Sequence, residues 1–249
     1  MTSEVRGAVL RRLTTPHADT RFSEAAFARP LAAELGCRPH EVLEALWGLV
    51  GEGLAYLDPA GQGSGTDNWR WRASAAGIAA AVGGNWEPRD VDGYLRRLRA
   101  YRPQVDAIAI AYVAEALRAF NARCYLATSV MLGVASESVI NGLGHAIVAV
   151  RGEQATQLEK LLNSSTSRLA KQFEEMRKQL VQIDLPDGLT DTLTLDAVAD
   201  LLRISRNNVG HPTGAAVDED TAYTHLQMAA RYLQKMATLQ AHLEAQATS

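Results

Sequence analysis

The chain has 249 residues, of which 47% are apolar and 21% charged, and its 25 basic and 28 acidic side chains give a formal net charge of −3. These proportions are ordinary for a soluble globular protein and exclude a disordered or collagen-like chain. The length allows one large domain or two smaller ones, each with a core. Because the net charge is slightly negative, a nucleic-acid partner has to be argued from local basic patches.

Only Cys37 and Cys124 are present, without a Cys-x-x-Cys pair, so the sequence indicates neither a disulfide framework nor a thiolate zinc site. The histidines have no companions at ligand spacing, and we expect no metal and no cofactor. Charged residues in the first turns argue against a signal peptide, and Glu137 interrupts the longest apolar region, residues 124–150. We therefore expect a cytoplasmic protein that does not span a membrane.

Residues 1–82 have the pattern of three helices followed by a β-ribbon. Apolar spacing predicts a first helix over residues 5–13, a second from near Ala25 to a stop at Gly36, and a third that begins at Pro39. A short apolar run, a turn-rich tip and the alternating segment 69–72 then predict two paired strands. Turn residues between positions 82 and 90 mark a boundary, so we expect a linker and a basic connecting helix over 83–102 and a second domain over 103–249.

The segment ELGCRPHEVLEALWGLVGEGLAYLDP, followed by WRWRA, resembles a winged helix-turn-helix over residues 1–82. In that family the third helix reads the DNA major groove and the wing contacts the backbone. The positions of the third helix expected to be exposed would repel phosphates, since they are His40, Glu41, Glu44 and Glu52.

The wing segment itself alternates aromatic and basic residues, Trp69, Arg70, Trp71 and Arg72. Such an alternation can contact phosphates and stack on bases, which makes these four residues candidates for nucleic-acid binding. The alternative is that each tryptophan packs beneath the wing and each arginine is solvated.

The connecting segment contains a second basic pattern. Arg96, Arg99 and Arg102 are three positions apart and are flanked by Tyr94 and Tyr101. This spacing fits a solvated helix face, and it also fits a surface that follows a nucleic-acid backbone, which makes Arg96 and Arg99 binding candidates.

Residues 103–249 read as helical throughout, with apolar spacing that predicts about five helices packed as a bundle. The helices are expected around residues 110–120, 127–135, 158–180, 195–202 and 226–243. The third of these is long and polar, as in an insertion or a dimer arm. The predicted fold class is therefore mainly α.

The fourth of these helices ends in the sequence LLRISRNNVGHPTG, in which Gly210 and Pro212 are stop signals. On a continuous helix Arg206 and His211 would lie about 140° apart, and a left-handed Gly210 would bring them closer. A histidine can move a proton near neutral pH, and a guanidinium can stabilise charge on a phosphate, so the pair suits metal-free phosphodiester cleavage. Asn207 can bind a phosphate oxygen or orient the imidazole. The alternative is ordinary helix-stop chemistry, with the arginine favoured by the helix dipole.

Arg206-Asn207-Asn208-Val209-Gly210-His211 also matches the R-N-x-x-x-H signature of the HEPN superfamily of small helical bundles. The segment AYVAEALRAFNARCYLATSVMLGVASESVI resembles the first two helices of such bundles, and the resemblance covers about residues 103–245. It implies a metal-independent endoribonuclease of bacterial anti-phage defence or toxin–antitoxin systems, formed as a homodimer with an RNA substrate. Arg206 and His211 would be the catalytic residues, and Asn207 and Asn208 their polar companions.

Glu137 lies among apolar neighbours, where a carboxylate needs either a partner or exposure to solvent. Arg123, Arg206 or His211 could be that partner, and an acidic residue at this place resembles what many HEPN proteins carry. Because many HEPN proteins are inactive, the alternative function is a winged-helix regulator or scaffold that binds DNA or a protein, with the bundle as its dimerising part.

Overall fold

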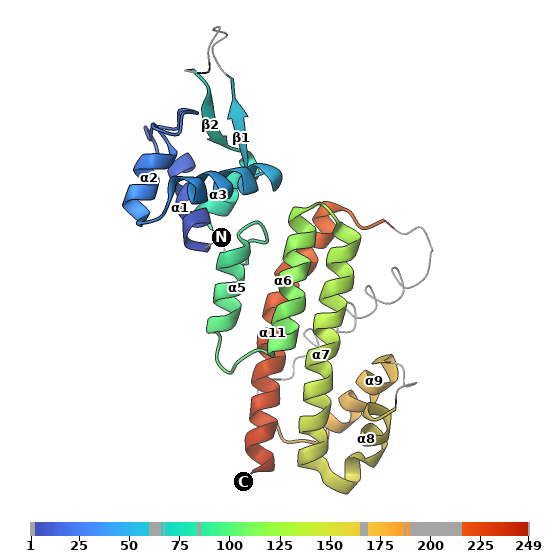
Figure 1. Ribbon diagram of the computed structural model, residues 1–249. Helices are drawn as coiled ribbons and strands as arrows, with labels where there is room; N and C mark the ends of the chain where they lie inside the picture. Colours follow the sequence, from blue (N-terminus) through green and yellow to red (C-terminus); the bar gives the residue numbers. More distant parts are fainter. Residues whose placement is uncertain are drawn as a thin grey trace. The chain divides into compact units, whose positions relative to one another are not determined.

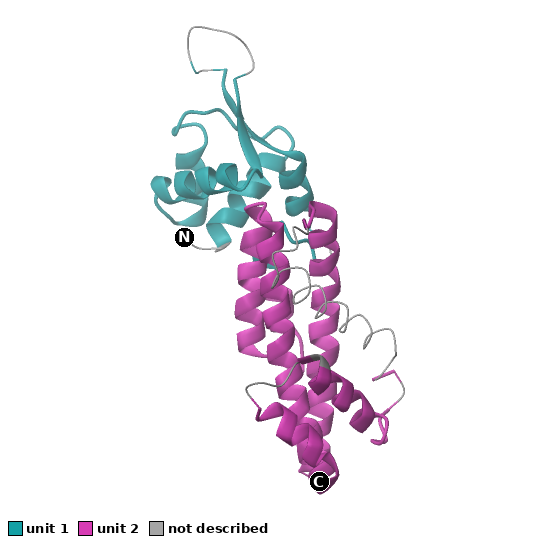
Figure 2. Ribbon diagram, turned by 90° about the vertical axis from the view of Figure 1, so that its right-hand side faces the viewer, with its two compact units in different colours: residues 1–93 teal, residues 94–249 magenta. Residues whose placement is uncertain are grey.

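The structure is a computed structural model that describes residues 3–59, 66, 68–83, 86–164, 169–186, 188–189 and 216–248 (Figure 1). Its described residues are mostly helical, which confirms the predicted mainly-α class. The chain divides into two compact units, residues 1–93 and 94–249 (Figure 2). The sequence placed a boundary in the turn-rich stretch over residues 82–90.

The first unit contains α1 (Ser3–Thr14), α2 (Ala28–Leu35), α3 (Pro39–Gly51), β1 (Ala55–Asp58), β2 (Arg70–Ala73) and α4 (Ala75–Val82). Gly36 ends α2 in the left-handed conformation, with φ 65°, and Pro39 opens α3, as the sequence predicted. The α2 helix begins later than expected, at Ala28 instead of near Ala25. The reason is a turn at Ser23, whose hydroxyl accepts a hydrogen bond from the Ala26 amide.

The ribbon pairs β1 with β2 in antiparallel register, with Ala55 opposite Ala73 and Asp58 opposite Arg70. A third short segment extends it. The Phe22 amide donates to the Trp69 carbonyl at 2.9 Å, and the Trp71 amide donates to the Thr20 carbonyl at 2.8 Å. Residues 20–22 therefore line the free edge of β2, an interaction that the sequence did not predict.

The core of the first unit lies between α1, α2, α3 and the inner face of the ribbon, with Val9, Leu46 and Leu49 fully buried. The α4 helix, which the sequence analysis missed, follows the ribbon closely. A Cβ atom at Gly77 would lie 1.9 Å from the Leu54 carbonyl oxygen. Only glycine therefore allows the α4 backbone to approach the start of β1 in this way.

The second unit is a helical bundle built around α7. Its elements are α5 (Val91–Ala100, which begins in the last residues of the first unit), α6 (Ala107–Asn121), α7 (Tyr125–Arg151), the 3-10 turn η1 (Gly152–Ala155), α8 (Thr156–Leu162), α9 (Leu169–Leu180) and α11 (Glu219–Ala247). The long α7 packs against both α6 and α11, and α8 and α9 pack against its C-terminal half (Figure 1).

Two helix predictions for this unit need correction. The single helix expected over residues 158–180 is wrong, because α8 ends at Leu162 and α9 begins at Leu169. The helix expected over 127–135 is much longer, since α7 spans 27 residues and its small residues pack between neighbouring helices. The helix expected around residues 195–202 lies outside the described residues.

Helix α5 is fixed to α11 by two tyrosines. The buried Tyr94 hydroxyl donates to the Leu226 carbonyl at 2.7 Å, and the Tyr101 hydroxyl lies 3.0 Å from Thr238 Oγ1. The following loop ends at Asp106, whose carboxylate accepts from the Ala109 amide and so caps α6. The orientation of α5 within this unit is therefore set on one side by the buried Tyr94 and the half-buried Tyr101, whereas Arg96 and Arg99 on its other side are exposed.

One helical stretch, residues 125–162, is long and apolar enough to cross a membrane, with a mean hydropathy of 1.3 over its best window. The sequence analysis expected no such segment. Half of that window is buried inside the protein, against α6 and α11. A buried core helix of a soluble protein has the same composition, so this stretch is weak support for a membrane location.

Candidate functional site

The residues of the predicted catalytic motif, Arg206, Asn207, Asn208 and His211, lie outside the described residues. The structure resumes at residue 216, just before α11, whose first turn is capped by Asp218. The Tyr125 hydroxyl donates to Glu219 Oε2 at 3.0 Å, which joins the first turn of α11 to the first turn of α7. The first turns of α7 and α11 therefore lie side by side.

Glu137 is exposed on α7, which agrees with the solvent-exposure alternative. Asn141 and His145 follow it at intervals of one helical turn and are exposed as well. The three side chains form one polar stripe on α7, whose sequence is otherwise largely apolar. Among the described residues the structure gives Glu137 no cationic partner, and its predicted supporting role stays a prediction.

Trp71 cannot stack on a nucleic-acid base, and that prediction is wrong. Its side chain is 1% exposed and lies between Phe22 and Trp47, with ring centroids 5.5 and 5.2 Å away. The β-alternation places Trp71 and its cross-strand neighbour Leu57 on the face of the ribbon that covers the core. The alternative, a tryptophan packed beneath the wing, is confirmed for this residue.

The outer face of the ribbon carries arginines that already have carboxylate neighbours. Arg72 Nε lies 3.3 Å from Asp58 Oδ2, within the same pair of strands. Arg70 is half-buried and pairs with Arg21 through a β-bridge. Arg21 in turn holds Asp19 at 2.6 Å, and its hydrogen bond lowers the pKa of that carboxyl group to about 2, with a smaller contribution from Arg70.

Trp69, the remaining residue of the wing prediction, is half-buried with its ring edge-on to Phe22 at 5.7 Å. The exposed aromatic side chain near the ribbon is Trp47 of α3, at 54% exposure, which the helical spacing had assigned to neither face. Of the positions expected to be exposed on α3 and just after it, His40 and Glu44 are exposed. Glu41 and Glu52 are half-buried because Glu41 accepts from the Arg38 amide and Glu52 pairs with Arg6.

The same pairing continues through the rest of the first unit. Three further arginines contact a carboxylate: Arg12 with Glu34, Arg29 with Glu24, and Arg89 with Glu87. A guanidinium that already faces a carboxylate gains less from a phosphate, because the phosphate has to displace or share that partner. Six of the nine arginines of the first unit face a carboxylate, and Arg11, Arg38 and Arg70 have no ion pair among the described residues.

Helix α5 differs in this respect. Residues 94–105 contain Arg96, Arg97, Arg99 and Arg102 and no acidic residue. Arg96 and Arg99 are exposed, and neither has an acidic partner in the part of the chain that the structure describes. Arg102 Nη1 donates to the carbonyls of Arg99 and Tyr101 at 2.9 and 2.8 Å, which braces the end of the helix.

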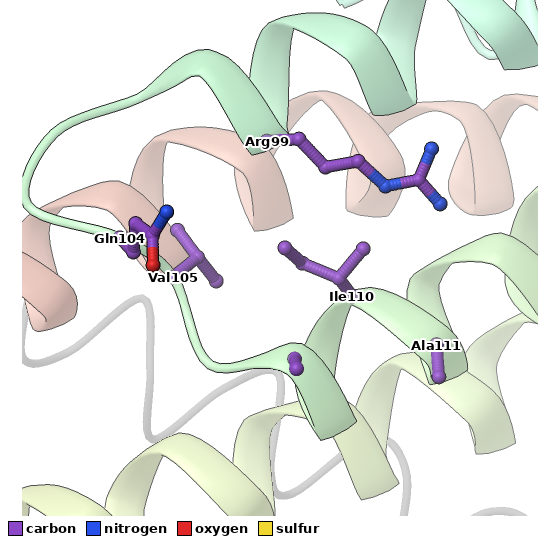
Figure 3. A pocket seen from close by; sticks show the side chains of 6 residues that line it. Arg99, Gln104, Val105, Ile110 and Ala111 are labelled. Atoms are coloured by element: carbon purple, nitrogen blue, oxygen red, sulfur yellow. The ribbon is translucent and has the colours of Figure 1, made fainter.

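A pocket of about 440 Å³ opens beside this arginine face, where α5, the loop after it and the first turns of α6 meet (Figure 3). Its lining residues are Arg99, Gln104, Val105, Ala107, Ile110 and Ala111. The pocket is thus apolar, with one guanidinium and one amide among its walls. No sequence pattern predicts this pocket, because it depends on the course of the loop over residues 101–106.

No group of three or more histidine, cysteine, aspartate and glutamate side chains lies close enough to hold a metal ion among the residues described. Comparisons with protein-family models, with curated proteins and with solved structures found no match.

Proposed function

We propose that this protein is a metal-independent endoribonuclease of the HEPN type, which acts as a homodimer in bacterial anti-phage defence or in a toxin–antitoxin system. The observation that carries the proposal is the sequence Arg206-Asn207-Asn208-Val209-Gly210-His211, which ends seven residues before the Asp218 cap of the last long helix. Support comes from the helical bundle in which that helix packs, with α6 and α7 as its other long members.

The chemistry follows from the two charged groups of the motif. An RNA 2′-hydroxyl attacks the adjacent phosphorus, so that the O2′–P bond forms, the P–O5′ bond breaks, and a cyclic phosphate and a 5′-hydroxyl result. His211 takes the proton from the 2′-hydroxyl and delivers it to the departing 5′-oxygen, since a histidine side chain can accept and donate a proton near neutral pH. Arg206 stabilises the charge on the non-bridging oxygens through paired N–H donors. Asn207 and Asn208 orient these groups or bind a phosphate oxygen.

The first unit would be a winged helix. The order of three helices and a ribbon supports this interpretation, and so does the short segment of residues 20–22, which pairs with the edge of β2 through an isolated β-bridge. Because most of its arginines face carboxylates, we propose that this unit does not supply the main contacts to RNA. The proposed contact surface lies elsewhere in the chain.

Incubation of the purified full chain with total RNA in the presence of a chelator tests the proposal. We expect cleavage products with cyclic phosphate ends. Both His211→Ala and Arg206→Ala should reduce cleavage by roughly 10² to 10⁴-fold, the usual loss when a proton-transfer group is removed. Matched controls are His40→Ala on α3 and Arg11→Ala on α1, two exposed side chains of the other unit.

Circular dichroism of all four variants checks that the helical content is unchanged. Undiminished cleavage by His211→Ala would overturn the catalytic assignment. Wild-type protein that binds RNA or DNA without cleaving it would match the alternative function, a regulator or scaffold that uses the bundle to dimerise.

A further inference from the structure

We propose that the open face of α5 and the pocket beside it bind single-stranded RNA, with phosphates against Arg96 and Arg99 and one base in the pocket. This inference rests on the proposed function and deepens it, because it names the surface that holds the substrate. It is independent of the residues that carry the chemistry.

The charge of this surface is the first argument. Arg96 and Arg99 are one helical turn apart, so their side chains leave the helix on the same side, with Cβ atoms about 5–6 Å from each other. Both are exposed, and the described residues supply no carboxylate to either. In a chain of net charge −3, residues 94–105 hold four arginines and no acid. A nucleic-acid backbone that binds here releases its own counterions without competing with a carboxylate of the described residues.

The second argument is that the surface is held in place. Tyr94 and Tyr101 fix the opposite side of α5 to α11 by hydrogen bonds of 2.7 and 3.0 Å. The Arg102 guanidinium bonds to two carbonyls at the end of the helix and thereby holds the turn that leads to Gln104. Little order has to be imposed on the protein when the ligand binds, which favours affinity.

The pocket supplies what a base needs. Its volume of about 440 Å³ falls within the range of about 300–1,000 Å³ that is typical of small-ligand sites. Val105 and Ile110 offer apolar contact to a base, and the Gln104 amide can both donate to and accept from its edge. Arg99 contributes to both the pocket and the phosphate-binding face, since it lines the pocket and is one of the two exposed arginines of α5 (Figure 3). A guanidinium can also stack on a base.

These features favour a single strand over a duplex. A base can enter a pocket only when it is unpaired and free to turn away from its neighbours, as in single-stranded loops and ends. A duplex would contact the two arginines but could not place a base in the pocket. Inorganic polyphosphate has no bases and would likewise contact only the arginines, so it can be used to measure how much the base contributes to binding.

The binding experiment uses the full chain with His211→Ala, so that bound RNA stays intact, and follows the fluorescence anisotropy of a labelled single-stranded RNA 12-mer. The double variant Arg96→Ala/Arg99→Ala should bind about tenfold more weakly. Its plot of log affinity against log salt should be shallower by about 1.4, the slope expected for two contacts to a single strand. The control is Arg118→Ala, which removes an exposed arginine of α6 that is paired with Glu115.

Two changes test the pocket. One introduces a charge at an exposed lining residue, and the other removes the bases from the ligand. Ala111→Glu places a carboxylate at the pocket and should weaken binding severalfold, whereas Ala111→Gln, of the same size, should weaken it less. A 12-mer of abasic ribose phosphates should bind at least about fivefold more weakly than RNA, because base contacts of this kind contribute substantially. Polyphosphate should compete poorly.

Unchanged RNA affinity in Arg96→Ala/Arg99→Ala would overturn the proposal. Equal binding of RNA and the abasic oligomer would overturn the part of it that concerns the pocket. The proposed function fails separately: wild-type protein that binds RNA through these arginines but does not cleave it would refute the ribonuclease and leave this surface in place. Cleavage that depends on His211 but not on Arg96 and Arg99 would support the ribonuclease and refute the proposed RNA-binding surface.

Discussion

Most arginines of the first unit face a carboxylate, whereas the two exposed arginines of α5, Arg96 and Arg99, do not among the described residues. In the first unit, Arg72 on the ribbon lies against Asp58, and Arg6, Arg12, Arg21, Arg29 and Arg89 each contact a carboxylate of the same unit. On α5, Arg96 and Arg99 face solvent with no carboxylate beside them among the described residues. Both regions carried a basic sequence pattern that suggested nucleic-acid binding.

Whether an arginine is available to bind a phosphate depends on the charged side chains next to it. Exposed ion pairs contribute little to folding stability, commonly below about 1 kcal/mol. They nevertheless lower the positive potential that a phosphate meets, because the carboxylate lies within a few ångströms of the guanidinium. The count of arginines in a segment therefore says less about polyanion binding than the count of arginines without an acidic partner.

The largest effect that would sharpen this comparison is expected from Trp71→Ala. If the ribbon tryptophan is part of the core, its removal should lower the free energy of unfolding of the first unit by about 3–5 kcal/mol. Urea denaturation followed by circular dichroism measures this loss. Trp47→Ala, at an exposed position, should cost far less. A loss of RNA affinity in Trp71→Ala without a loss of stability would restore the wing as a binding surface.

The second effect is a difference between the two units in how their stability depends on pH. Burial lowers the pKa of His225, on the inner side of α11, below its ordinary value of 6.5. The unfolded chain therefore binds the proton more readily than the folded chain, and this contribution to stability, present above pH 6.5, is lost as the pH falls below it.

Thermal unfolding between pH 7 and pH 5 should thus show the second unit weakening first, and His225→Gln should make its melting temperature less dependent on pH. The matched control is His40→Gln, at an exposed position of the first unit. An equal pH dependence in the His225→Gln and wild-type proteins would contradict the assignment.

The smallest expected effect comes from removing the carboxylate partner of one arginine on the ribbon. Asp58→Asn removes the carboxylate next to Arg72 and keeps the size of the side chain. The free energy of unfolding should change by less than about 1 kcal/mol. The affinity for single-stranded RNA at low salt should rise about twofold, because one more guanidinium becomes available. If the affinity is unchanged, pairing with Asp58 is not what keeps the ribbon from binding RNA.

Much of the fold could be predicted because its local signals are strong. Gly36 and Pro39 punctuate α2 and α3 as expected, and regular large apolar residues mark α1, α6 and α11. The α4 helix was missed because its sequence, AAGIAAAV, has almost no polar residues and so no helical period to detect. The interruption between α8 and α9 was missed because apolar spacing continues across it.

The candidate site was predictable only in part. The alternation of residues 69–72 predicts that two faces exist, but it does not say which one covers the core, and that choice decides the role of Trp71. The spacing of Arg96 and Arg99 predicts a shared face correctly, whereas their lack of carboxylate neighbours depends on the packing of distant segments. The pocket next to Arg99 depends on the loop over residues 101–106, which carries no periodic pattern.

Near the centre of α7, two glycines allow side chains of neighbouring helices to approach the α7 backbone closely. Gly142 and Gly144 are about 200° apart around the helix, and each is pressed by a neighbour. A Cβ atom at Gly142 would lie 2.8 Å from the Gln240 amide of α11, and one at Gly144 would lie 2.8 Å from a Leu162 methyl group of α8. A methyl group added at either glycine would therefore have to displace the end of a side chain, that of Gln240 on α11 or that of Leu162 on α8.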